Sequence, residues 1–263
     1  MKNSFEQHLK QLDKQENKLL NKPENNLMKS TILPIKDKIE GIIPQQLKST
    51  LNAAFYKGFQ LIFEKGNPFI EKTYDKEKLS LDFDVNDYAL NKKLNQRHMK
   101  RLDKTSNQSK LINSSFSVVE GGVLGFLGIG IPDIPLFLAV IIRTLNEIAL
   151  SYGFDYETEE EKTYMLLLIN GAISKKELQL ECNKQVEALG SQIDQNIVSE
   201  INFDEQMHVT SDLFSEALLT AKFIQGIPIV GAVGGVINYN IIHKISSYAR
   251  IKYKKRYLAK KLS

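Results

Sequence analysis

The residue types that could do chemistry in this 263-residue chain are few and scattered. Residues 82–86, Asp-Phe-Asp-Val-Asn, begin like a calcium-binding EF-hand loop, with oxygen-bearing side chains at alternate positions. However, Asp87 stands where that loop needs its turn glycine, and Lys93 stands at the position of its final bidentate glutamate. The pattern therefore predicts an acidic turn and no calcium site.

The sequence also lacks the motifs of other metal sites, of catalytic nucleophiles and of nucleotide-binding sites. The histidines lack metal-ligand spacing and Cys182 stands alone, so we expect neither a zinc site nor a disulfide framework. The chain has no GxxxxGK(S/T) phosphate loop and no GxSxG nucleophile elbow. Gly128-x-Gly130 is followed by Asp133 where a dinucleotide fingerprint needs its third glycine. We therefore predict no metal, no cofactor and no catalytic residue, and the sequence leans towards a protein that is not an enzyme.

The best candidates for a ligand site are polar side chains in apolar surroundings. Arg143 and Glu147 are four positions apart, so on a helix they share one face. Two interpretations stay open, a structural pair in a satisfied buried network or a polar site in a cleft. Asp133 lies about 15 Å before Arg143 along a helix axis, so one site could use both only with a ligand that spans this gap. The predicted ligand-binding residues are Glu120, Asp133, Arg143, Glu147 and Asn238.

Two glycine-rich apolar segments would position these side chains. Residues 121–142 carry Asp133 as their only charge, and residues 223–242 carry none. Each segment reaches the roughly 20 residues of a membrane span, but Pro132 and Pro135 around Asp133 indicate a helix start and shorten the uninterrupted helix. We therefore expect core helices that pack closely through their glycines. A hydrophobic hairpin that opens onto a bilayer and a cleft for a small ligand are the alternatives.

Hydrophobic periodicity predicts helices over most of the remaining chain. Residues 45–64 and 208–225 have the apolar spacing of amphipathic helices, and residues 86–118 look helical with a strongly cationic middle. Strand-like alternation is scarce. The predicted fold class is therefore all-α, with one helical domain over 41–263 and a polar, mobile or weakly helical extension over 1–40.

Helix boundaries are marked by capping residues and glycines. Asp133 is expected to cap a helix that runs to about residue 151. Thr158 and Ser174 each precede a glutamate by three positions, which is the capping-box pattern. The glycines that we expect to end helices are Gly66, Gly153, Gly171 and Gly190.

The last 21 residues are the basic element of the chain. Residues 243–263 contain eight Lys or Arg and no Asp or Glu, and because the whole chain is +4, the remainder carries −4. A stripe of apolar residues from Ile241 to Tyr257 predicts a helix that either completes the core or lies on an anionic membrane surface. No nucleic-acid motif accompanies the charge, so we expect no specific nucleic acid partner. The residues predicted to bind a membrane or partner are Arg250, Lys252, Lys254, Lys255, Arg256, Lys260 and Lys261.

Two blocks of the sequence resemble the EcsC family of bacterial proteins. They cover residues 120–155 and 227–258, and with a weaker block before them the resemblance spans about 41–258. Lys162 departs from the arginine that the family pattern leads us to expect, and a lysine cannot supply a bidentate guanidinium. The motif residues that carry the resemblance are Gly121, Gly125, Gly128, Pro132, Arg143, Tyr152, Gly153, Asp155, Pro228, Gly231, Gly235 and Asn238.

The resemblance implies a bacterial protein of a membrane process and implies no reaction, since the family is named for a product encoded beside an ABC transporter. A single cysteine and an N-terminus without an apolar signal region lead us to expect a cytoplasmic protein. We therefore expect a non-enzymatic accessory protein, peripheral at the inner face of the membrane, whose basic C-terminal helix binds anionic lipid or a membrane protein complex. The alternative is a small-ligand-binding protein or enzyme with a polar site between the glycine-rich segments. The sequence does not predict an oligomeric state.

Overall fold

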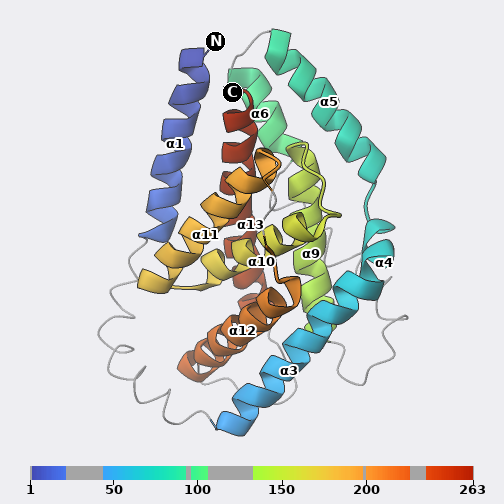
Figure 1. The fold of residues 1–263 in the computed structure, drawn as a ribbon, viewed down its shortest axis with the longest axis vertical. Coiled ribbons are helices and arrows are strands. Elements are labelled where there is room, and N and C mark those ends of the chain that lie inside the picture. Colours follow the sequence, from blue (N-terminus) through green and yellow to red (C-terminus); the bar gives the residue numbers. More distant parts are fainter. Residues whose placement is uncertain are drawn as a thin grey trace.

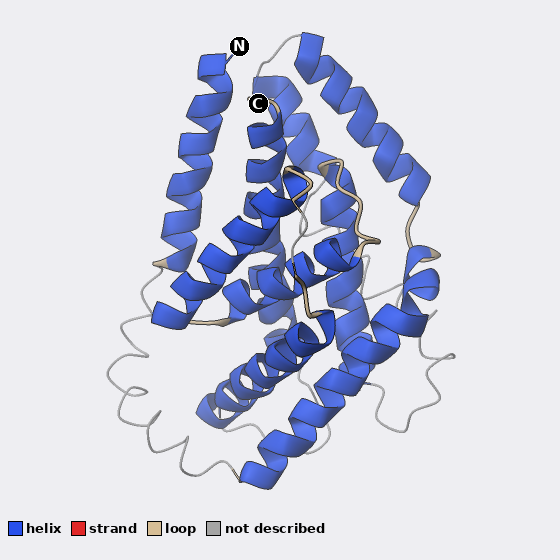
Figure 2. Cartoon of the chain, in the orientation of Figure 1, coloured by secondary structure: helices blue, strands red, loops and turns tan. Residues whose placement is uncertain are grey.

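The computed structural model describes residues 2–21, 44–92, 96–105, 133–197, 200–225 and 235–262. Within these ranges every regular element is a helix, which confirms the all-α class (Figures 1 and 2). The elements are α1 (Lys2–Leu20), α3 (Gln45–Leu61), the π-helix η1 (Ile62–Gly66), α4 (Asn67–Glu71), α5 (Lys76–Lys92), α6 (Gln96–Thr105), α9 (Asp133–Ser151), α10 (Glu159–Ile173), α11 (Lys176–Asp194), α12 (Phe203–Gln225) and α13 (Gly235–Lys260).

Helices α9 and α13 form the centre of the domain. Helix α13 packs against α9, α10, α1 and α11, while α9 also carries α3 and α5 on its other sides (Figure 1). The stretch Ile134–Ser151 of α9 is long and apolar enough to cross a membrane by composition, but 94% of it is buried inside the protein. A helix that is apolar all round is either a membrane span or the core of a folded domain, and this burial favours the core.

The chain ends α9 with the left-handed glycine that its sequence predicts. Gly153 has φ +76°, and its N–H donates to the carbonyl of Leu150 at 3.0 Å. The N–H of Phe154 donates to the carbonyl of Ala149 at 3.0 Å, which completes a Schellman motif. At the start of α10, Thr158 Oγ1 accepts the N–H of Glu161 at 3.2 Å. Both boundaries are confirmed.

Two other glycines do not end helices, and that prediction was wrong. Gly171 lies inside α10, where a Cβ atom would come 2.8 Å from the ring of Tyr248. Gly190 lies inside α11, where a Cβ atom would come 2.9 Å from the ring of Tyr164. These glycines let aromatic rings of neighbouring helices approach the backbone. Ser174 ends α10 and gives α11 no side-chain cap, so the second capping box was also wrong.

Gly66 does not end its helix either. The chain passes from α3 through the π-helix η1 into α4, and Pro68 occupies the first turn of α4, where its missing N–H leaves no helical hydrogen bond unmade. Residues 82–86 are also helical within α5, so the acidic turn predicted there was wrong. The helix predicted over 86–118 corresponds to the end of α5 and to α6, and residues 106–118 lie outside the described ranges.

The N-terminal residues are helical, which is one of the two states expected for them. Residues 2–20 form helix α1, which packs against α13 and α11 instead of extending from the domain (Figure 1). Phe5, Leu12 and Glu16 of α1 are buried in this contact. The glycine-rich residues 121–132 and 226–234 lie outside the described residues, so their mutual packing stays a prediction. The helices that follow them, α9 and α13, do pack against each other.

Candidate functional site

Helix α9 places Arg143 and Glu147 together, as their spacing predicts. Arg143 Nε donates to Glu147 Oε1 at 3.1 Å, and Arg143 Nη2 lies 3.0 Å from the same oxygen. Both side chains are buried, and Glu147 Oε2 has no hydrogen-bond partner among the described residues. Burial raises the pKa of Glu147 to about 7, and the neighbouring Arg143 opposes this rise. The pair is therefore an ion pair with a carboxylate that protonates easily.

A chain of tyrosine hydroxyls lies beside this ion pair. The hydroxyls of Tyr74 and Tyr156 are 2.7 Å apart, and Tyr156 donates to Glu71 Oε1 at 2.9 Å. Asn146 Nδ2 donates to the Tyr74 hydroxyl at 3.4 Å, and the Arg143 guanidinium lies 5.9 Å from the centre of the Tyr74 ring. Burial raises the pKa of Tyr74 to about 12, so this hydroxyl stays neutral at physiological pH. These contacts tie α4 to α9, which is a structural role.

The side chains of the remaining predicted ligand-binding residues lie outside the described part of the structure. Glu120 lies outside the described residues, as do the motif residues Gly121, Gly125, Gly128, Pro132, Pro228 and Gly231. Asp133 begins α9 and Asn238 lies in the first turn of α13, but the placement of their side chains is not described. Gly235 begins α13. The polar site between the glycine-rich segments therefore stays a prediction.

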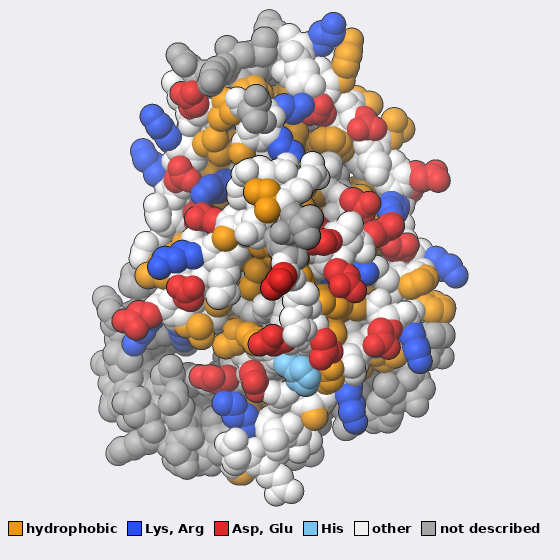
Figure 3. Space-filling model, viewed as in Figure 1, with side chains coloured by type: hydrophobic (Ala, Val, Ile, Leu, Met, Phe, Trp, Pro, Cys, Tyr) orange, Lys and Arg blue, Asp and Glu red, His pale blue; other side chains and the backbone are white. Residues whose placement is uncertain are grey.

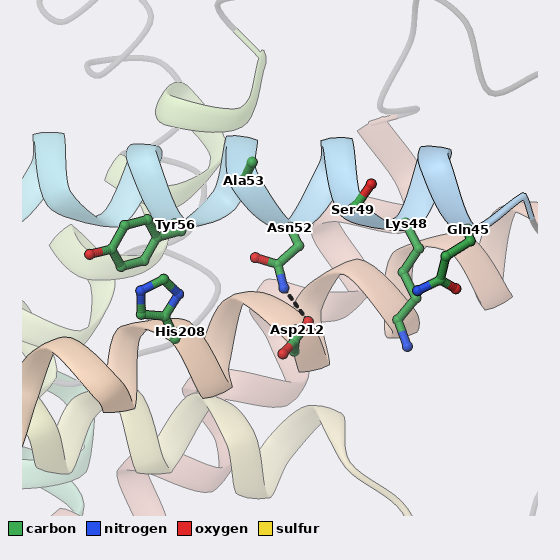
Figure 4. A pocket seen from close by; sticks show the side chains of 8 residues that line it. All are labelled: Gln45, Lys48, Ser49, Asn52, Ala53, Tyr56, His208 and Asp212. Atoms are coloured by element: carbon green, nitrogen blue, oxygen red, sulfur yellow. Dashed lines mark hydrogen bonds between the residues drawn. The ribbon is translucent and has the colours of Figure 1, made fainter.

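A groove that the sequence did not predict lies between α3 and α12 (Figure 4). Its volume is about 400 Å³, and at one end the rings of Tyr56 and His208 stack with centres 3.7 Å apart. Tyr56 donates to Asp204 at 2.6 Å, and Asn52 donates to Asp212. The lining residues are Gln45, Lys48, Ser49, Asn52, Ala53, Tyr56, His208 and Asp212. Their three-to-four-residue spacing along α3 was the only signal in the sequence.

No metal site accompanies this groove. Among the described residues no group of three or more His, Cys, Asp or Glu side chains could hold a metal ion. His208 Nε2 lies 3.9 Å from Asp204 Oδ2, one turn earlier on α12, which is too far for a hydrogen bond. The groove therefore offers polar contacts to a ligand and no oriented nucleophile–base pair.

The basic residues of α13 do not form an exposed cationic face. Lys252 is only 3% exposed and Arg256 only 7%, and the apolar stripe of this helix is buried in the core. Carboxylates of other elements pair with six basic residues in the last part of this helix and just after it. The ion pairs are Lys252 with Glu16 and Glu187, Lys254 with Asp103, Lys255 with Asp13 and Glu16, Arg256 with Glu161 and Asp194, Lys260 with Asp194, and Lys261 with Asp87.

Arg256 shows how deeply these charges are built into the fold. Its Nη1 and Nη2 donate to the two oxygens of Glu161 at 2.7 and 3.1 Å, and Asp194 accepts two further bonds at 2.9 Å. The guanidinium also lies 4.3 Å from the ring centre of Phe154 and 4.4 Å from that of Tyr164. Two of the predicted membrane-binding residues, Lys252 and Arg256, are therefore buried parts of the folded domain. Arg250, which belongs to the same predicted set, is half-buried.

Among the described residues, the three large apolar side chains with the highest exposure all belong to α5. Leu81, Val85 and Tyr88 are 63%, 61% and 64% exposed, and their spacing of four and three residues places them on one face. The Lys92 ammonium lies 5.4 Å from the centre of the Tyr88 ring at the end of this stripe. Figure 1 shows α5 along the outer edge of the molecule, and Figure 3 shows hydrophobic side chains at the surface there.

Helix α6, which packs against α5, is strongly basic. Its buried face carries Met99 and Leu102, while Lys100 and Arg101 are exposed. The sequence signalled this element through the cationic middle of residues 86–118. The prediction of a membrane-binding surface nevertheless went to the C-terminal tail, which has more basic residues.

Comparison with known proteins finds a family match over nearly the whole chain. The EcsC protein family matches residues 6–258, so the matched region includes α1 as well as the two blocks noted in the sequence. Protein EcsC of Bacillus subtilis (strain 168) is 27% identical over 127 residues, which are 48% of this chain and 50% of that protein. The chain thus spans about half the length of this curated relative. No solved structure matches. Because the family match runs from α1 nearly to the end of α13, the chain belongs to the EcsC protein family.

Proposed function

We propose that this protein is a non-enzymatic accessory protein that associates peripherally with the inner face of the membrane. Its binding surface is the α5–α6 surface, defined as the apolar stripe Leu81, Val85 and Tyr88 of α5 together with the exposed Lys100 and Arg101 of α6. The observation that carries the proposal is the exposure of three large apolar side chains, each above 60%, on one helical face beside a cationic helix.

The chemistry of this surface fits an anionic lipid interface. Apolar side chains of an interfacial helix enter the boundary between headgroups and acyl chains, and tyrosine favours that depth because its hydroxyl stays in water. Each Lys or Arg near an anionic leaflet contributes about 1 kcal/mol of attraction. Lys92, at the end of the stripe, and Lys100 on α6 are both exposed. The surface therefore combines the apolar and the electrostatic contributions.

The C-terminal helix does not offer the same combination. Its apolar stripe is buried, and Lys252, Lys254, Lys255 and Lys260 already have carboxylate partners that lipid phosphates would have to displace first. This is why we transfer the proposed membrane contact from α13 to α5 and α6. A membrane protein complex with an acidic, apolar contact face could use the same surface.

Sedimentation with vesicles tests the proposal. The wild-type protein should pellet with phosphatidylglycerol-containing vesicles and much less with phosphatidylcholine vesicles, and added salt should weaken binding. Lys92→Glu with Lys100→Glu should weaken binding at least about tenfold, because two attractive charges become repulsive. Leu81→Ser with Val85→Ser should weaken it as well, by removing the inserted apolar groups.

Matched controls separate this surface from general effects of charge and hydrophobicity. Lys57→Glu on α3 with Lys65→Glu on η1 makes the same change in net charge at exposed positions. Leu178→Ser with Leu180→Ser on α11 removes two leucines that are about half-exposed. If a control pair lowers binding as much as the corresponding α5–α6 pair, or if wild-type binding ignores lipid charge, the proposal is wrong.

The α3–α12 groove favours a second candidate, a small-ligand-binding protein. Its volume of about 400 Å³ lies within the usual range of ligand sites, and its lining offers an ammonium, a carboxylate, an amide and an imidazole. The purified protein should then retain a small polar molecule from a bacterial metabolite extract, as detected by mass spectrometry. His208→Ala with Asp212→Asn should lose it, and retention by this variant would exclude the groove.

A further inference from the structure

The contact between α1 and α13 is unusual because charges lie at its centre. Glu16 of α1 is 4% exposed, and its carboxylate contacts Lys252 and lies 2.6 Å from Lys255 Nζ. Asp13, one turn earlier, lies 2.8 Å from Lys255 Nζ. Glu187 of α11 lies 2.9 Å from Lys252 Nζ and 3.6 Å from Lys255 Nζ. Two lysines of α13 thus share three carboxylates, two of which come from α1.

The apolar part of the same contact is small. Phe5 and Leu12 are the buried hydrophobic residues of α1, while Leu9, Leu19 and Leu20 are only partly buried against the core. Buried ion pairs add little net stability, since desolvation offsets their attraction, but removing one partner is costly. An element with few buried apolar contacts opens more readily than the core. The attachment of α1 therefore depends on its carboxylates remaining paired with the two lysines.

Helix α1 also has the pattern of an interfacial helix. Phe5, Leu9 and Leu12 lie on the face turned to α13, and the exposed face carries Lys10, Lys14 and Lys18 one turn apart. Such a helix can bury its apolar face either against the protein or at the boundary between lipid headgroups and acyl chains. Glu16 interrupts the apolar face, because it lies between Leu12 and Leu19 on the buried side of the helix. This carboxylate pairs with Lys252 when α1 is docked. Its negative charge would oppose insertion of the apolar face into a bilayer.

We propose that α1 is a latch that covers a second anionic-lipid site, formed by Lys252 and Lys255 of α13. This inference rests on the proposed membrane association through α5 and α6. After first contact with an anionic surface, lipid phosphates compete with Asp13 and Glu16 for the two lysines. Release of α1 then removes two of the three carboxylates that pair with these lysines, leaving Glu187 of α11, and exposes the apolar face of α1 to the lipid. Figure 1 shows α1 at the edge of the domain, where it can leave without disturbing the packing of α9 with α13.

The variant Glu16→Gln tests the latch, with Glu6→Gln as its matched control. Both remove one negative charge from α1, but Glu6 lies on the exposed face. In the absence of lipid, amide hydrogens of residues 2–20 should exchange faster in Glu16→Gln than in Glu6→Gln. With phosphatidylglycerol vesicles, Glu16→Gln should bind at least about fivefold more tightly than the control, the effect of one further lysine near the headgroups.

A cross-link provides a test that keeps charge constant. In a Cys182→Ser background, Asp13→Cys with Lys255→Cys can be joined by a short cleavable thiol cross-linker, since the two wild-type side chains are in contact. The joined and cleaved forms of this protein have the same charges. Both forms lack Lys255 and keep Lys252 and the apolar face of α1, so release of α1 in the cleaved form should still tighten vesicle binding and speed exchange in residues 2–20.

The outcomes distinguish the latch from the proposed function. If the wild type binds anionic vesicles through α5 and α6 but Glu16→Gln matches Glu6→Gln and the joined form matches the cleaved form, the latch is overturned alone. If none of these proteins binds vesicles, the membrane function is overturned and the latch falls with it. If α1 exchanges equally fast in both glutamine variants without lipid, Glu16 does not hold α1 and the latch is overturned.

Discussion

At the scale of single residues, buried charges are the most distinctive feature of this protein. Arg143 and Glu147 form one buried pair, and Arg256 bridges Glu161 and Asp194. A buried charge is tolerated only with a partner and hydrogen bonds. Such residues therefore contribute to where helices sit more than to net stability.

The pH dependence of stability should reveal Glu147. Its pKa in the folded protein is raised from 4.5 to about 7, so the folded state binds this proton more tightly than the unfolded state. The stabilisation from the bound proton is complete below pH 4.5 and is lost as the pH rises through 7. Glu147→Gln cannot titrate, so urea unfolding between pH 4 and 8 should show the variant gaining stability relative to the wild type as pH increases. A difference that is constant with pH would contradict the assignment.

Arg256 should be among the most sensitive positions for stability. Arg256→Ala leaves two carboxylates without their buried cation and should lower the free energy of unfolding by about 3–5 kcal/mol. Lys260→Ala is the control, because Lys260 also pairs with Asp194 but its side chain is 49% exposed. That change should cost less than about 1 kcal/mol in the same urea titration. Equal losses would show that Arg256 is not the centre of the network.

At the scale of elements, glycines set how closely helices approach. Gly171→Ala would bring a Cβ atom within 2.8 Å of the Tyr248 ring. That ring cannot easily move, because it is fully buried and its hydroxyl donates to Asn183 at 2.6 Å. Overpacking should cost about 1–3 kcal/mol, which exceeds the helix-propensity gain of about 1 kcal/mol.

Thermal or urea unfolding measures this effect. Gly66→Ala is the control, since its Cβ atom would meet nothing closer than 3.3 Å. Its effect on the free energy of unfolding should stay within about 1 kcal/mol. Stabilisation by Gly171→Ala would mean that α10 and Tyr248 of α13 are farther apart than described.

The sequence predicts elements well where the signal is local. Thr158 caps α10 and Gly153 ends α9 because hydrogen bonds within a few residues decide both. Gly171 and Gly190 misled the same reasoning, since their neighbours belong to other helices. For glycine, a helix stop and a close helix–helix contact leave the same mark in a sequence.

At the scale of the whole molecule, the candidate binding surface could not be predicted from charge counts. The basic tail does form a helix, but its counter-ions come from residues as far away as Glu16, 236 positions from Lys252. Only the fold shows which cations are neutralised. The exposed stripe of α5 was equally invisible, because the pattern of apolar residues alone cannot tell an inner face from an outer one.

The distribution of counter-ions around the C-terminal helix has a consequence for how this chain reaches its native state. Carboxylates that neutralise α13 come from α1, α5, α6, α10 and α11, which are made before it. A nascent chain that lacks its final segment thus carries surplus negative charge at positions meant to be interior. Such long-range pairing slows folding and makes the last step cooperative. Truncation before α13 should therefore yield an expanded, acidic polypeptide and no smaller folded core.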